Sequence, residues 1–380
     1  MKFVKIIGKI LPKLDKVTGY KSAALKELLK EELKPARKRF LFIISDAGGG
    51  HRASALAVKD EIESIIGDQV QIIIVPMTEM LEPLPRWLGN TLEKTYSGSL
   101  KKGAYWMEPV LYSFVKNIRL VPLLLESTCI RVAQYIEHFN PDIIVSFVHN
   151  VQDILHGALK YNKKNGIIPL MSVVTDLVSL RDEWMIPEQE LVFVPTEEAK
   201  IFFMKHGMAE EKIIISGLPI NSRFFKLKES RDELMGKYGI KERKFTVMIL
   251  MGGSGSDVTY KYTKTLNDSG LDVQVIACCG NNKLLKSKME ELSKKASIPI
   301  YVFGFTREIP ELMKMSDMLV TKPGPGSIAE GISQDLPMLV DDTKYTMWQE
   351  RGNTDYVVYN CFGWALHSEK DLQVTVRNLF

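Results

Sequence analysis

The sequence predicts an α/β protein made of two doubly wound domains, each a parallel sheet covered by helices on both faces. The chain has 380 residues, more than a single hydrophobic core usually organises. From residue 40 onward, short apolar runs alternate with amphipathic stretches, which is typical of parallel strands buried on both faces. The run "FLFIISDAGGGH" also has a later counterpart in "FTVMILMGGSGS", and both lead straight into glycines. These observations together favour two Rossmann-like domains.

The strand candidates form two series separated by a polar segment. Amphipathic stretches between the strands, such as Ser54–Ile66 and Ser327–Ser333, predict helices. The polar, charged segment from Asn221 to Lys244 has no strand character, so we place the domain boundary inside it. The prediction is a basic segment over residues 1–39, an N-terminal domain over 40–225 and a C-terminal domain over 226–380. The predicted strands are Phe40–Ser45, Val70–Val75, Asp142–Phe147, Pro169–Thr175, Leu191–Pro195 and Lys212–Ser216, then Phe245–Met251, Asp272–Cys278, Ile300–Phe303, Met318–Thr321 and Pro337–Val340.

Composition narrows the class of protein. No apolar run approaches the roughly 18 residues that a membrane-spanning helix needs. Four cysteines, two of them adjacent, give neither a disulfide framework nor metal-ligand spacing, which favours a reducing compartment. Residues 1–39 carry 12 Lys/Arg and 4 Asp/Glu, with apolar residues near helical spacing. Two interpretations stay open for this segment: binding to an anionic membrane surface, or a solvated basic tail interrupted at Pro12. Nucleic acid is a poor partner, because no motif that reads it is present.

Glycine-rich loops follow strands at three places: Gly48–Gly50, Gly252–Gly255 and "TKPGPGSIAE", which begins at Thr321. A strand that turns directly into a helix leaves free N–H groups at the helix start, and these bind anions. Glycines let a phosphate or sugar approach that backbone closely. A single loop of this kind is often explained by tight turning of the chain alone. Three such loops, the first of which ends in His51, indicate that the protein binds a nucleotide-linked substrate.

A set of motifs, in chain order, resembles one enzyme family. The motifs are "SDAGGGHRASALAV", "VVTDL" followed by Trp184, "ISGLPI", "LMGG", "CCGNN", "TKPGPGSIAEG" and "WQERGN". They look like the monogalactosyldiacylglycerol synthases, inverting glycosyltransferases of the GT-B fold, and the likeness covers about residues 39–363. It implies two Rossmann-like domains facing a cleft, and transfer of galactose from UDP-galactose to the free hydroxyl of 1,2-diacylglycerol.

The resemblance also assigns roles to residues. His51 is expected to be the general base, since a neutral histidine at a helix start suits proton abstraction near pH 7. Glu330, expected on the first turn of its helix, is the implied ligand of the ribose. The other expected donor-binding residues are Gly49, Gly50, Gly252, Gly253, Lys322, Gly324, Gly326, Ser327, Gln349, Glu350 and Asn353. Asp341 and Asp342 are adjacent rather than spaced as Asp-x-Asp, and we interpret them as loop residues. No metal and no cofactor are therefore expected.

Aromatic and basic residues are mixed between residues 84 and 125, a composition that suits a membrane interface. By the resemblance this region meets the lipid acceptor, and an ordinary helical core is the other interpretation. The expected partners are the UDP-sugar, diacylglycerol and an anionic lipid surface. The expected location is peripheral on an intracellular membrane, at its cytoplasmic face or the plastid envelope, without a clear transit peptide. The acceptor and membrane candidates are Trp87, Lys101, Lys102, Tyr105 and Trp106.

Some features depart from the family pattern and keep alternatives open. Bulky Trp348 stands where the family has a glycine close to the donor, so UDP-glucose is an alternative donor. The chain ends at Phe380, and we expect the closing C-terminal helices of a GT-B fold to be short or missing. The other hypotheses are a polyprenyl-linked acceptor as in the peptidoglycan transferase MurG, a UDP-sugar epimerase, and a non-catalytic paralogue that binds nucleotide-sugar or lipid.

Overall fold

A computed structural model describes residues 38–45, 49–80, 122–186, 188–240, 243–343, 346 and 350–379. These residues cluster into two compact units. Unit 1 contains described residues up to 175 and those from 180 to 219, whereas unit 2 contains residues 176–179 and those from 220 onward. The predicted boundary at 225/226 falls in α10 (Arg223–Lys226), a few residues after this break.

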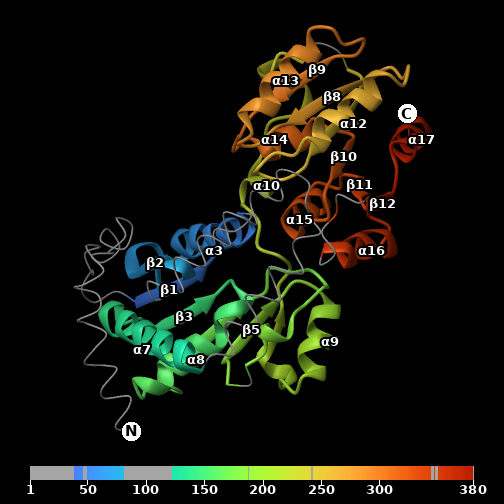
Figure 1. Cartoon of the computed structure of the whole chain (residues 1–380). Coiled ribbons are helices and arrows are strands. Elements are labelled where there is room, and N and C mark those ends of the chain that lie inside the picture. Colours follow the sequence, from blue (N-terminus) through green and yellow to red (C-terminus); the bar gives the residue numbers. More distant parts are fainter. Residues whose placement is uncertain are drawn as a thin grey trace. The chain divides into compact units, whose positions relative to one another are not determined.

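Unit 1 is built on a six-stranded parallel sheet (Figure 1). The strand order is β2-β1-β3-β4-β5-β6, so the chain reverses its direction of travel across the sheet between β1 and β3. The strands are β1 (Lys38–Ile44), β2 (Val70–Pro76), β3 (Ile143–Ser146), β4 (Leu170–Val173), β5 (Leu191–Val194) and β6 (Ile213–Ile215). The helices are α3 (Gly50–Ile66), α4 (Met77–Met80), α7 (Pro122–Phe139), α8 (Gln152–Tyr161) and α9 (Glu197–Lys205).

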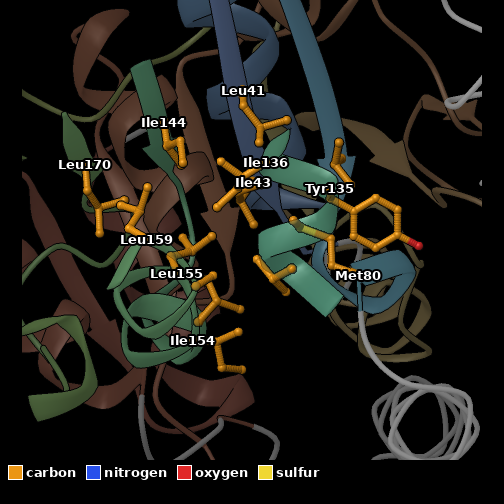
Figure 2. Packing of buried hydrophobic residues seen from close by; sticks show 14 of the residues in the cluster. Leu41, Ile43, Met80, Tyr135, Ile136, Ile144, Ile154, Leu155, Leu159 and Leu170 are labelled. Carbon is orange, nitrogen blue, oxygen red and sulfur yellow. The ribbon is translucent and has the colours of Figure 1, made fainter. Parts of the chain in front are cut away.

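Both faces of this sheet are covered, as continuous apolar strands require. Successive side chains of β1 point to opposite faces. Leu41 and Ile43 pack with α7 and α8 in the cluster shown in Figure 2, which includes Ile136 and Leu155. Phe42 and Ile44 belong to a second cluster with α3. The sheet is therefore the middle layer of three, with α3 on the face opposite α7 and α8.

Unit 2 repeats this architecture with a second six-stranded parallel sheet. Its order is β12-β11-β10-β7-β8-β9, so the reversal lies between β7 and β10. The strands are β7 (Phe245–Leu250), β8 (Val273–Cys278), β9 (Ile300–Phe303), β10 (Met318–Thr321), β11 (Met338–Asp341) and β12 (Gly363–Leu366). The helices are α10, α11 (Arg231–Lys237), α12 (Val258–Asn267), α13 (Lys283–Ser293), α14 (Ile309–Lys314), α15 (Pro325–Ser333), α16 (Arg351–Tyr359) and α17 (Glu369–Leu379).

All of the predicted strands are present, each within two residues of its predicted ends, which confirms the two doubly wound domains. The predicted helices begin earlier than expected, at Gly50 and Pro325, because their first turns include the glycine loops. The sequence analysis missed β12. This four-residue strand begins with a glycine whose Cβ position would lie 1.9 Å from the carbonyl oxygen of Met338, so pairing with β11 requires a glycine there.

Candidate functional site

The site candidates lie at the carboxyl edges of the two sheets. In open parallel sheets, ligands bind outside the carboxyl ends of the strands, where the strand order reverses. The loop after β1 leads to Gly49, Gly50 and His51 in unit 1. The loops after β7 and β10 carry the glycines and Lys322 of unit 2. The residues of these loops thus lie at the reversal point of each sheet.

The start of α3 combines a bare backbone with a histidine. Gly49 is the N-cap residue with φ +81°, a left-handed conformation that favours glycine. The first helical hydrogen bond runs from the Ala53 N–H to the Gly49 carbonyl oxygen at 3.1 Å. Buried Ser54 donates from Oγ to the Pro219 carbonyl oxygen at 3.1 Å and so fixes this turn. The first turn therefore has a defined orientation and favours a negative or neutral group over a cation.

His51 is half-buried on this first turn. Its ring atom Nδ1 lies 2.8 Å from Oγ1 of Thr175, a residue just beyond Val173 at the end of β4. Thr175 is 6% exposed, and its hydroxyl also donates to the Phe147 carbonyl oxygen at 3.4 Å. The sequence analysis missed Thr175 as a site residue, although it lies in the quoted motif "VVTDL". Its position as the last residue of the predicted strand Pro169–Thr175 was the available signal.

In unit 2, two loops touch backbone to backbone. The Asn281 N–H donates to the Gly253 carbonyl oxygen at 2.9 Å. A Cβ on Gly255 would lie 1.9 Å from the Cys279 carbonyl oxygen, and a Cβ on Gly280 would lie 2.3 Å from the Gly253 carbonyl oxygen. These glycines therefore permit close approach of the two loops, whereas Gly252 (φ +90°) and Gly253 line the reversal point itself.

Lys322 is held between two of the predicted glycines. Cβ atoms built on Gly252 and Gly324 would lie 3.4 and 3.2 Å from its Cε. Its Nζ lies 2.9 and 3.1 Å from the two carboxylate oxygens of Glu350, which precedes α16. With a side chain 34% exposed and paired in this way, Lys322 is not a mobile surface lysine. It places a positive charge at the reversal point between β7 and β10.

The helix α15 continues this site. Gly324 is its N-cap and Pro325 its first residue, so the N–H groups of Gly326 and Ser327 lie in the unpaired first turn. Glu330 lies in the second turn, not the first as predicted, because the helix begins at Pro325. Burial raises the pKa of Glu330 from its ordinary value near 4.5 to about 7. A carboxylate in this setting is suited to accept hydrogen bonds from ligand hydroxyls.

Buried polar contacts fix the segments on either side of Glu350. Asn353 is 3% exposed and donates from Nδ2 to the Pro323 carbonyl oxygen at 2.9 Å, which joins α16 to the loop before α15. Asp341 is the buried last residue of β11, so its interpretation as a loop residue is wrong. Its carboxylate accepts hydrogen bonds from the Tyr262 hydroxyl at 3.1 Å and the Thr343 N–H at 3.0 Å, and burial raises its pKa.

Several predicted residues lie outside the described ranges. These are Gln349 and the acceptor and membrane candidates Trp87, Lys101, Lys102, Tyr105 and Trp106, as well as most of the basic segment 1–39. Among the described residues, none of the helices has the length and apolar character needed to cross a bilayer. No cluster of three or more His, Cys, Asp or Glu side chains suited to a metal occurs in the described part of the chain.

Each unit contains a stretch that matches the model of a known protein family. Residues 51–220 match the family model described as monogalactosyldiacylglycerol (MGDG) synthase, and residues 246–342 match the glycosyltransferase family 28 C-terminal domain. The chain is 31% identical to a probable chloroplastic MGDG synthase of Glycine max and to MGDG synthase of Spinacia oleracea. Each match covers 90% of this chain but 65% and 66% of those proteins, slightly under two thirds of their length.

Solved structures agree on the fold. MurG of Acinetobacter baumannii has a TM-score of 0.58 at 10% identity, with 90% of each chain covered. UDP-GlcNAc 2-epimerase of Neisseria meningitidis, bound to UDP-GlcNAc, has a TM-score of 0.53 at 13% identity and covers 90% of this chain and 91% of its own. These likenesses establish the two-domain GT-B fold. The family-model matches and the named relatives in turn relate the chain to the monogalactosyldiacylglycerol synthase family.

Proposed function

We propose that this chain is an inverting glycosyltransferase that moves galactose from UDP-galactose to the free hydroxyl of 1,2-diacylglycerol. The observation that carries the proposal is His51, which stands on the first turn of α3 with Nδ1 bonded to Thr175. The matches to the two family models and the glycine loops of unit 2 support it. The relatives are named galactolipid synthases, and this chain is proposed to share their donor and acceptor.

The proposed reaction is a single displacement. His51 takes the proton of the acceptor hydroxyl as that oxygen forms a bond to the anomeric carbon. The bond from the anomeric carbon to the diphosphate oxygen breaks, and UDP leaves with the electron pair. Attack from the opposite side inverts the anomeric configuration and yields a β-glycoside. The base therefore needs a ring nitrogen with a lone pair, directed at the acceptor.

Charge that develops on the leaving UDP needs stabilisation. In this proposal the unpaired N–H groups at Gly326 and Ser327, the positive end of α15 and the Lys322 ammonium provide it. Glu330 accepts hydrogen bonds from the ribose hydroxyls. Gln349 and Glu350 are proposed to contact the sugar. No metal is assigned a role in this scheme.

The lipid acceptor requires contact with a bilayer. We propose that the chain binds peripherally to an anionic membrane through the basic segment 1–39 and the aromatic-basic stretch of residues 84–125. The related synthases of Glycine max and Spinacia oleracea are named chloroplastic, so we propose the plastid envelope as the location.

The test is an assay of the purified chain with diacylglycerol in anionic liposomes, comparing UDP-galactose with UDP-glucose, each with and without EDTA. Galactolipid formed in the presence of EDTA supports the proposal, and glucolipid instead reassigns the donor. Absence of product with measurable UDP binding would favour a non-catalytic nucleotide-binding protein.

Two histidine variants test the base. His51→Ala is expected to lower kcat by about 10²- to 10⁴-fold, the range for loss of a general base, and to leave UDP affinity unchanged. His138→Ala, an exposed position at the end of α7, is the matched control and should retain activity. An equal loss of UDP affinity and turnover in His51→Ala would make His51 a ligand contact and not a base.

A further inference from the structure

We infer that Thr175 is a positioning residue that holds His51 in the tautomer needed for proton abstraction. This inference rests on the proposed role of His51 as a base. The Thr175 hydroxyl accepts a hydrogen bond from Nδ1–H of His51 and donates its own proton to the Phe147 carbonyl oxygen. The lone pair of the neutral ring is then on Nε2, which takes the proton of the acceptor hydroxyl.

The direction of these hydrogen bonds follows from the two neighbours of one hydroxyl. Oγ1 of Thr175 lies 2.8 Å from Nδ1 of His51 and 3.4 Å from the Phe147 carbonyl oxygen. A hydroxyl has one proton to donate, and a carbonyl oxygen can only accept. Both contacts are satisfied only if the hydroxyl donates to the carbonyl and Nδ1 carries a proton. If the hydroxyl instead donated its proton to Nδ1, the lone pairs of Oγ1 and of the Phe147 carbonyl oxygen would face one another in a buried site, which is unfavourable.

The proton on Nδ1 decides what the other nitrogen can do. The hydrogen bond at one ring nitrogen sets which nitrogen of a neutral imidazole is protonated. With Nδ1 protonated, Nε2 is the basic atom at the far edge of the ring. After Nε2 takes a proton, Nδ1–H still donates to Thr175, so the contact persists in the cationic product state. The ring needs no reorientation during the reaction.

The contact also ties the base to the rigid part of unit 1. Phe147 follows β3 and Thr175 follows β4, while His51 lies on the first turn of the helix after β1. These three strands are neighbours in the sheet. Thr175 is 6% exposed and Phe147 is fully buried, so packing restrains the hydroxyl. This contact holds the ring of the base in one orientation, which proton transfer in a defined geometry requires.

The experiment combines nuclear magnetic resonance with kinetics on the full chain. The sequence has six histidines, so ¹⁵N-histidine labelling gives few signals, and His51→Ala assigns the signal of interest. The ¹⁵N shifts and ring couplings report directly which nitrogen carries the proton. We expect Nδ1–H for His51 in the wild type, Nδ1–H retained in Thr175→Ser, and a substantial Nε2–H population in Thr175→Val.

Kinetics supply the second readout. Thr175→Val should lower kcat by about 10- to 100-fold with little change in the KM for the UDP-sugar, whereas Thr175→Ser should restore most activity. Thr263→Val is the matched control, since Thr263 is a fully buried threonine whose hydroxyl donates to the Thr259 carbonyl oxygen at 2.8 Å on α12. It should leave the tautomer of His51 and kcat unchanged.

The outcomes separate this inference from the proposed function. An Nε2–H tautomer in wild-type His51, or a tautomer unchanged in a folded Thr175→Val variant, overturns the role of Thr175 whatever the activity. An Nδ1–H tautomer in a wild-type chain that transfers no sugar would overturn the proposed function and leave the contact established. If Thr175→Val does not fold, the wild-type tautomer and the Thr175→Ser kinetics still decide the matter.

Discussion

Alanine at Gly255 should disrupt the junction between the two glycine loops of unit 2. Gly255 has φ +72°, where a non-glycine residue is destabilised by about 1–2 kcal/mol. Its Cβ would also lie 1.9 Å from the Cys279 carbonyl oxygen, a backbone atom that cannot rotate away. Overpacking of this kind adds about 1–3 kcal/mol. The expected total is about 2–5 kcal/mol, a large share of the roughly 5–15 kcal/mol that stabilises a domain.

Gly270→Ala is the matched control for this experiment. Gly270 has φ +71° at the other end of α12, but no atom lies within 4 Å of its Cβ position, so only the backbone strain of about 1–2 kcal/mol applies. Amide hydrogen exchange in β7 and β8 measures both variants. The additional 1–3 kcal/mol should make exchange in Gly255→Ala roughly 5- to 150-fold faster than in Gly270→Ala. Equal exchange rates in the two variants would refute the close approach of the loops.

Further predictions concern unit 2. Lys322→Met should weaken UDP binding about tenfold or more, as expected for loss of a charge-assisted hydrogen bond, while exposed Lys264→Met should not; isothermal titration compares them. Tyr262→Phe removes a donor to the buried Asp341 carboxylate and should lower the free energy of unfolding of unit 2 by about 1–3 kcal/mol in denaturant titrations. Burial raises the pKa of Glu330 from near 4.5 to about 7, so between these pH values the folded protein holds a proton that the unfolded chain has released. Stability should therefore fall as pH rises through this window in the wild type but not in Glu330→Gln, which thermal unfolding at several pH values checks.

The fold could be predicted because its signals are local and repeated. Apolar runs such as that of residues 40–44 are continuous rather than alternating, and this pattern alone indicates a parallel strand with both faces buried. The strand β12 escaped prediction because "GWAL" has no such run, and its position depends on pairing with β11. The register of that pair is a tertiary property: Gly363 lies opposite Met338, and a Cβ at residue 363 would lie 1.9 Å from the Met338 carbonyl oxygen.

Some residues of the candidate site could likewise be predicted from the sequence, and others could not. The glycines at residues 252 and 324 could be found because a glycine after a strand and before a helix is a pattern with a physical cause. The partner of Lys322 could not, since Glu350 lies 28 residues away and joins it only when β10 and α16 are assembled. The same applies to Asp341, whose carboxylate is explained by Tyr262, 79 residues earlier. A residue whose role depends on a partner far away in the sequence belongs to no local motif, so the sequence alone does not reveal that role.

A threonine at a strand end performs the same structural task in each unit, and only one of the two contacts a histidine. Thr321, the last residue of β10, donates from Oγ1 to the Leu250 carbonyl oxygen at the end of β7, at 2.7 Å. Thr175 donates likewise to the Phe147 carbonyl oxygen across β3 and β4. Such a hydroxyl fixes the carboxyl edge where both sites are proposed to lie, but it still has lone pairs to offer. In unit 1 a lone pair of the Thr175 hydroxyl faces Nδ1 of His51. The hydrogen bond that joins the two strand ends uses the hydroxyl proton and leaves this oxygen as an acceptor, so the same hydroxyl can orient the base.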